Sequence, residues 1–359
     1  MNENFNESKQ SSNGNTDVFN IFDERATDEN FKRFAAQLLE ISGQIGFKVS
    51  SRGWCYQLES ARLINRDQFD RVETVINKCR KKGILPIDFV AEEEGRQFSG
   101  VEEPENASPL EFLKGYIKAP LDCHNWYTPN WWEGEEYYIQ MLVEKIDLKT
   151  LFSPVCERYH IPIATSKGWS SMLQRAIYAR RFKDAEDKGL KCVLLYCGDH
   201  DPDGLRISDF IMSNLKELQN IYWENGEEGY SPHNLLIHRF GLDADFIYEH
   251  NLTWIENLIT GSGKSLADPS HKNFKMPYVQ EYIKKFGIRK CEANAIVPMP
   301  NEARFLVENT IIAFLEDDAL VRFNNKMKAV KADMDRIRIK TGLKEAIEKA
   351  IELIDNVNF

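Results

Sequence analysis

The sequence lacks several features that would assign it to a broad class at once. Its 359 residues include seven cysteines, but no two have the Cys-x-x-Cys spacing of zinc and redox motifs. No apolar run reaches the ~18 residues of a membrane span, and no secretory signal is evident. We therefore expect a cytoplasmic protein with reduced thiols and no membrane partner.

Positive charge is also in deficit. The chain carries 46 Lys and Arg against 56 Asp and Glu, a net charge of −10. A basic nucleic-acid-binding protein usually has the opposite balance, so binding to DNA would require a local basic patch. The length allows two or three domains, each with its own core.

The most informative stretch is an apolar run followed by an acidic turn. Residues 192–196 resemble a buried strand, and Asp199, Asp201 and Asp203 follow within five residues. Helical spacing resumes over 205–218, so the acids would lie at the carboxyl end of a parallel strand, where such sheets bind ligands. Crowded carboxylates repel, and Mg²⁺ (or Mn²⁺) relieves that repulsion. A solvated acidic turn that caps the helix is the alternative.

Two other segments repeat this strand–helix pattern. One strand is predicted over 137–143 and ends at Glu144 and Lys145, and another over 161–164 ends near Lys167. Successive units of this kind predict a mostly parallel α/β sheet, in which the first and third strands can be neighbours. A metal site is then expected where the strand-end carboxylates meet, with the ligands Glu144, Asp199 and Asp201.

The N-terminal part has a different pattern. After a polar segment expected to be disordered, three helices and a short β segment are predicted at 31–45, 51–63, 67–82 and 84–90. This order is typical of a winged helix-turn-helix. Residues 51–90 hold eight Lys or Arg against five Asp or Glu, a local excess suited to duplex DNA. The candidate contacts lie on the third helix: Arg71, Lys78, Arg80 and Lys81. A small interaction domain with a solvated basic helix is the alternative.

The strand-end motifs together resemble a known family. Glu144-Lys145-x-Asp147, Lys167-Gly168 and Asp199-His200-Asp201-Pro202-Asp203-Gly204 resemble the Toprim domain of topoisomerases, primases and related nucleases. The resemblance is greatest to the topoisomerase VI A subunit and its meiotic recombination relatives. That family carries a CAP-like winged helix before the Toprim domain, with an Arg-x-x-x-Tyr motif that Arg52 and Tyr56 match.

The resemblance implies a domain plan, although the chain departs from the family in places. Gly53 stands where an acid is usual and Asp203 where a tyrosine is common, and the short connectors resemble the stand-alone "mini-A" proteins of phages and mobile elements. Beyond a further strand at 235–240, residues 251–280 are expected to be irregular and 301–316 and 317–357 helical. The expected regions are a disordered tail (1–28), a winged helix (29–95), a connector (96–135), a Toprim domain (136–300) and a helical C-terminal region (301–359).

The activity implied by the resemblance is Mg²⁺-dependent cleavage of double-stranded DNA. Tyr56 would attack a backbone phosphate and form a phosphotyrosyl link, while Arg52, one helical turn earlier, stabilises the phenolate or holds the phosphate. Lys145 and Lys167 would contact phosphate, and Asp203 and Glu292 would support the site. A nucleoid-associated homodimer is expected, with a possible separate ATPase subunit. Two alternatives remain: a hydrolytic Toprim nuclease that uses metal-bound water, and a non-catalytic DNA-binding subunit.

Overall fold

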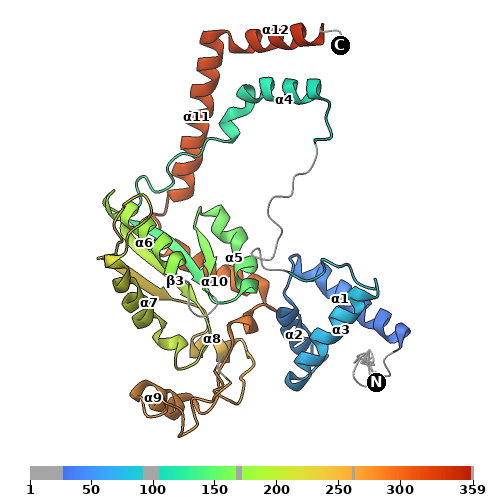
Figure 1. The fold of residues 1–359 in the computed structure, drawn as a ribbon, viewed down its shortest axis with the longest axis vertical. Coiled ribbons are helices and arrows are strands. Elements are labelled where there is room, and N and C mark those ends of the chain that lie inside the picture. Colours follow the sequence, from blue (N-terminus) through green and yellow to red (C-terminus); the bar gives the residue numbers. More distant parts are fainter. Residues whose placement is uncertain (1–26, 92–104, 167–171, 261–262, 357–359) are drawn as a thin grey trace, which may run out of the picture. The chain divides into compact units, whose positions relative to one another are not determined.

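The fold is described from a computed structural model, which covers residues 27–91, 105–166, 172–260 and 263–356. The chain divides into two compact units, Met1–Ala91 and Glu92–Phe359. Each unit has its own buried core. Figure 1 shows the helices and strands of both units.

The first unit contains the three predicted helices. They are α1 (Asp28–Ile45), α2 (Ser51–Ser60) and α3 (Phe69–Lys81), with a 3-10 turn at Arg66–Gln68 before α3. Side-chain oxygens of Thr27 and Ser50 accept backbone N–H groups at the starts of α1 and α2, as helix N-caps do. Leu38, Leu58 and Ile76, one from each helix, are fully buried and form the core of this unit. The helical part of the prediction is therefore confirmed.

The predicted β segment at 84–90 is wrong, and the wing is not confirmed. In the described part of this unit no strand is present, and 84–90 form turns. Phe89 stacks on Trp54 with the ring centroids 4.9 Å apart, and the Arg80 guanidinium donates to the carbonyl oxygen of Ile87. The apolar residues that suggested a strand are used to pack a turn against the helices.

The second unit is built on four parallel strands in the order β2-β1-β3-β4. Helices connect them along the chain, as in other parallel sheets. This confirms the predicted α/β class. All four strands begin and end within about two residues of the predicted segments, and β1 matches its segment at both ends. The elements are β1 (Tyr137–Val143), α5 (Ile146–Arg158), β2 (Ile163–Thr165), α6 (Met172–Glu186), β3 (Lys191–Cys197), α7 (Ile207–Lys216) and β4 (Leu235–Arg239).

Both faces of this sheet are covered by helices (Figure 1). Leu194 and Tyr196 of β3 lie in one buried cluster with residues of α6 and α7. On the other face the Cys156 thiol of α5 lies 3.6 Å from the sulfur of Met141 in β1. Helix α10 (Pro300–Ile312) packs on α5. The central strands are therefore buried on both sides, and their carboxyl ends are free to carry polar side chains.

Two shorter helices follow β4, α8 (Ala244–Glu249) and α9 (Pro277–Phe286). Residues 251–276 lie between them, and their described part forms no helix or strand, as predicted. The prediction of an irregular segment up to residue 280 is wrong at its end, because α9 begins at Pro277. Leu258, Leu266 and Val279 form a small separate core there.

The predicted connector contains an additional helix. Helix α4 (Pro109–Asp122) begins at Ser108, whose hydroxyl accepts the backbone N–H of Glu111 while the Glu111 carboxylate accepts that of Ser108. It packs against α12 (Leu343–Asp355). The single helix predicted over 317–357 is wrong: Gly342, with φ of 62°, separates α12 from α11 (Ala319–Thr341). None of the helices in the described ranges is long and apolar enough to cross a membrane.

Candidate functional site

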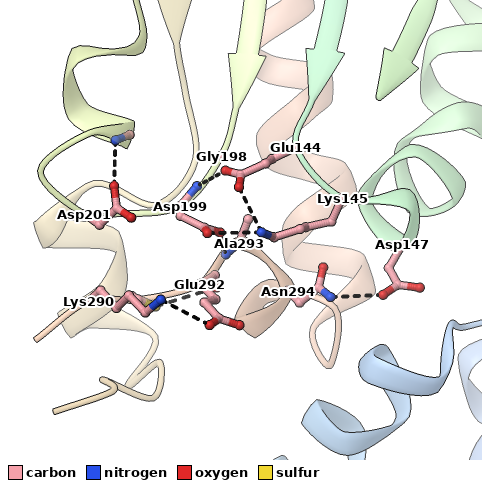
Figure 2. A network of polar contacts seen from close by, with 12 residues as sticks. Glu144, Lys145, Asp147, Gly198, Asp199, Asp201, Lys290, Glu292, Ala293 and Asn294 are labelled. Atoms are coloured by element: carbon pink, nitrogen blue, oxygen red, sulfur yellow. Dashed lines mark hydrogen bonds and ion pairs between the residues drawn. The ribbon is translucent and has the colours of Figure 1, made fainter. Parts of the chain in front are cut away.

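Three charged side chains meet where β1 and β3 end (Figure 2). The Lys145 ammonium lies 2.9 Å from Oε1 of Glu144 and 3.1 Å from Oδ2 of Asp199. The other Glu144 oxygen accepts the backbone N–H of Asp199 at 2.9 Å, and Oδ1 of Asp199 accepts that of Ala293 at 2.7 Å. One ammonium is thus held between two carboxylates that are 55 residues apart in the chain.

Strand pairing accounts for this meeting. Val143 and Cys197 are opposite each other at the last positions of β1 and β3, and the backbone N–H of Glu144 continues the ladder by donating to Cys197 at 3.0 Å. The next residues of both strands therefore emerge at one edge of the sheet. The predicted proximity of Glu144 and Asp199 is confirmed.

Burial and the ammonium set the charge of the site. Asp199 is 8% exposed, and burial raises its pKa to about 7, although Lys145 opposes this rise. Burial acts in the same direction on Glu144, but Lys145 and the Asp199 backbone N–H outweigh it and the pKa of Glu144 is lowered. The two carboxylates raise the pKa of Lys145 against the effect of burial. The raised pKa keeps the Lys145 ammonium charged at neutral pH.

Asp201 and Asp203 have separate partners in the turn after β3. Oδ1 of Asp201 accepts the backbone N–H of Gly204 at 2.6 Å, and burial raises the pKa of Asp201. A Cβ at Gly204 would overlap with the carbonyl oxygen of Asp199, so this turn requires glycine. Asp203 accepts the hydroxyl of Tyr278 at 2.9 Å, which is consistent with its predicted supporting place.

Sequence reasoning missed Arg239, the last residue of β4. Its Nη2 donates to the carbonyl oxygen of Asp199 at 3.1 Å and, at 3.4 Å, to that of Gly198. The sequence held a signal for this residue, since Arg239 is a cation near the end of the strand predicted over 235–240. The carboxyl ends of parallel strands meet at one edge of the sheet. Arg239 holds the backbone of the turn that carries the acids.

The segment after α9 completes the site. Glu292 lies 3.6 Å from the Lys290 ammonium, which is consistent with the predicted supporting role. The Asn294 amide donates to the buried carboxylate of Asp147 at 3.0 Å (Figure 2). Asn294 was not predicted, since nothing in the sequence relates positions 147 residues apart.

The donor set is suited to a hard divalent cation. The oxygens of Glu144 and Asp199 already face one shared cation, the Lys145 ammonium, and Asp201 interacts electrostatically with both carboxylates. The Asn294 side-chain oxygen is buried and finds no hydrogen-bond partner in the described part of the chain. Carboxylate oxygens are preferred ligands of Mg²⁺, and carboxylate and amide oxygens can accept hydrogen bonds from the waters that it keeps. Among the described residues, no three acidic, histidine or cysteine side chains converge as a preformed metal cluster, so the triad stays a prediction.

Tyr56 lies inside the first unit. It is 2% exposed, its hydroxyl accepts a hydrogen bond from Nη2 of Arg66 at 2.9 Å, and its ring packs edge-on against Phe69. The predicted partner, Arg52, forms ion pairs of 3.6 Å with Asp70 and Glu73. The guanidinium found at the hydroxyl is thus that of Arg66, which is also close to the Tyr56 ring.

The predicted DNA contacts on α3 differ in their surroundings. Arg71, Lys78 and Lys81 are exposed, whereas Arg80 is directed to the Ile87 carbonyl. Three of the four therefore lie at the surface, and Arg80 stabilises the fold of the unit. Lys167 lies outside the described residues.

Comparison with known proteins adds no assignment: no protein-family model matches the chain, and no curated protein matches it.

Proposed function

We propose that the protein cleaves DNA strands in a reaction that depends on Mg²⁺ or Mn²⁺. One observation carries the proposal: Glu144 and Asp199, from the ends of adjacent parallel strands, share one cation in a buried setting. Glu144, Asp199 and Asp201 would hold the metal. When bound, the metal would neutralise charge on the scissile phosphate and orient it.

The protein's own groups have defined tasks in this proposal. Lys145 lies between the two carboxylates and would pair with a phosphate oxygen of the DNA if a metal ion occupied its place. Arg239 and the Ala293 N–H fix Asp199 from two sides. Arg71, Lys78 and Lys81 on α3 supply phosphate contacts that are independent of DNA sequence.

The nucleophile has two candidates. Tyr56 would form a phosphotyrosyl link, with Arg66 rather than Arg52 beside its hydroxyl. Its exposure of only 2% favours the second candidate, a water molecule, because a tyrosine nucleophile would first have to leave its packing site. In the tyrosine mechanism a homodimer supplies Tyr56 of one protomer to the carboxylates of the other, and a separate ATPase subunit is a possible partner.

The test is cleavage of supercoiled plasmid in Mg²⁺, with products separated after denaturation. Wild type should nick or linearise the plasmid, and Asp199→Asn should abolish cleavage. The control Asp317→Asn replaces an exposed acid and should cleave like wild type. A Tyr56→Phe variant that keeps the rate identifies water as the nucleophile. Loss of cleavage together with a protein–DNA adduct in wild type identifies Tyr56. DNA binding without metal-dependent cleavage would favour a non-catalytic subunit.

Light scattering tests the dimer separately. A homodimer of the 41.7 kDa chain should have about 83 kDa, twice the chain mass, with or without DNA. A monomer under both conditions would contradict a reaction shared between protomers.

A further inference from the structure

A cavity of about 970 Å³ lies beside the carboxylate site, in the second unit. Its walls are the turn after β3, the start of α8 and one side of α9. The volume is at the upper end of the range found for small-molecule sites, so it can hold a ligand of nucleotide size.

Aromatic side chains line this cavity and are fixed in place. The Tyr278 hydroxyl donates to Asp203 at 2.9 Å, and the buried Tyr282 hydroxyl lies 2.9 Å from the carbonyl oxygen of His200. Phe286 packs on Tyr282 with ring centroids 4.9 Å apart. Flat surfaces held in this way lose little entropy when they stack on a planar ligand.

Tyr248 completes the aromatic lining from α8. It is 51% exposed, and its hydroxyl accepts a hydrogen bond from Arg289 at 2.6 Å. The Tyr248 ring is held at its hydroxyl, and about half of the residue is exposed. It is therefore the most accessible stacking surface of the cavity.

The charged residues of the lining indicate which part of a nucleotide would enter. Asp245 and Glu281 are exposed carboxylates at the cavity, and Arg206 and Lys285 are its cations. Carboxylates repel a phosphate but accept hydrogen bonds from the N–H groups of a base. Because aromatic faces and acceptors are found together, a base fits the interior better than a phosphate does.

The cavity is continuous with the candidate site through one turn. His200 and Pro202 line the cavity, while Asp199 and Asp201, which alternate with them along the chain, belong to the carboxylate site. Asp203 joins the two directly through its bond to Tyr278. A strand whose phosphate is held at Asp199 would therefore have a neighbouring nucleotide within reach of the cavity.

We infer that this cavity binds an unpaired base of the DNA strand next to the phosphate at the carboxylate site. The inference rests on the proposed function for its ligand class. The cavity takes the base by stacking on Tyr248 and Tyr278, and the carboxylates of Asp245 and Glu281 accept its N–H groups. The enzyme would then prefer strands that are locally unpaired beside the cut.

Binding of a labelled single strand of about 15 nucleotides, measured by fluorescence anisotropy in EDTA, tests this inference apart from cleavage. The probe is compared with an abasic strand of equal length, which keeps every phosphate and lacks every base. Wild type should bind the base-bearing strand about tenfold more tightly, as stacking on one or two aromatic rings provides. Tyr248→Ala should abolish this difference. The control Tyr222→Ala removes a tyrosine that is 82% exposed and outside the cavity, and should preserve it.

Two results would overturn the inference. One is equal binding of the two strands by wild type, and the other is a base preference that survives in Tyr248→Ala. If plasmid cleavage persists in either case, the proposed function stands without the base site. If the base preference is found but no cleavage occurs, the cavity stands and the proposed function fails.

Discussion

Replacing Lys145 by methionine should destabilise the second unit in a way that depends on pH and on Mg²⁺. Methionine keeps most of the side-chain length and removes the ammonium that lies within 3.1 Å of two carboxylates. Removing one partner of a fully buried ion pair costs about 3–5 kcal/mol. Since the Lys145 side chain is 30% exposed, solvent screening reduces the expected loss to about 2–3 kcal/mol.

The loss should be larger at pH ~8 than at pH ~6. Burial raises the pKa of Asp199 to about 7, so near pH 6 this carboxylate can take up a proton and relieve its repulsion from Glu144. A folded-state pKa above the unfolded value means that this group's contribution to stability falls as pH rises from ~4 to ~7. In Lys145→Met, which lacks the ammonium, this loss of stability should continue to a higher pH than in wild type.

Thermal melting in EDTA measures the effect. The expected decrease at pH ~8 is roughly 5 °C or more for a unit of this size. The control Lys188→Met removes an exposed ammonium and should melt like wild type. Added Mg²⁺ should raise the melting temperature of Lys145→Met more than that of wild type, because the metal can replace the missing charge. A variant that melts with wild type at pH ~8 would refute the electrostatic reasoning, and one without a Mg²⁺ effect would refute the metal site.

Three further predictions concern the surroundings of the site and His160, whose ring packs against those of Trp131 and Phe323. Gly204→Ala should lower the melting temperature and plasmid cleavage together, because a Cβ there displaces the Asp199 backbone; unchanged cleavage would argue against the turn geometry. Glu292→Gln should lower the melting temperature by up to roughly 2 °C, because it removes a partly exposed ion pair with Lys290, and should leave cleavage measurable. Full activity with unchanged melting would contradict the supporting role, and loss of all cleavage would give Glu292 a chemical role. Burial lowers the pKa of His160, so the stability of the protein should fall as pH drops below ~6.5. In the variant His160→Asn, asparagine tolerates the positive φ of 55° at this position, and the melting temperature should depend less on pH between ~7 and ~5. An equal pH dependence in the variant and wild type would refute this.

Sequence patterns predicted the sheet well because local signals and topology agreed there. The apolar runs before Glu144 and Asp199 are long enough to mark buried strands, and parallel pairing then brings both strand ends to one edge. The same logic could have reached Arg239 at the end of β4. Asn294 could not be found in this way, since only the folded chain brings it to Asp147.

The errors have physical causes as well. The apolar residues at 84–90 have the composition of a strand, but Phe89 is stacked on Trp54 and no neighbouring strand is available in the described part of that unit. Helix α4 was missed because its prolines resemble a connector, although Pro109 occupies the first turn, where proline is favoured. The assignment of Arg52 to Tyr56 relied on the resemblance to an Arg-x-x-x-Tyr motif and on helical spacing, whereas Arg66 reaches the hydroxyl from the following turn.

We propose that the carboxylates at the ends of β1 and β3 hold a metal ion that DNA cleavage requires. The most direct test is the initial rate of plasmid cleavage as a function of Mg²⁺ concentration, for wild type and Asp199→Asn. We predict a rate that saturates with Mg²⁺ for wild type and is lower by at least about 100-fold for the variant at every concentration. Equal rates for the two proteins, or cleavage by wild type in EDTA, would contradict the account.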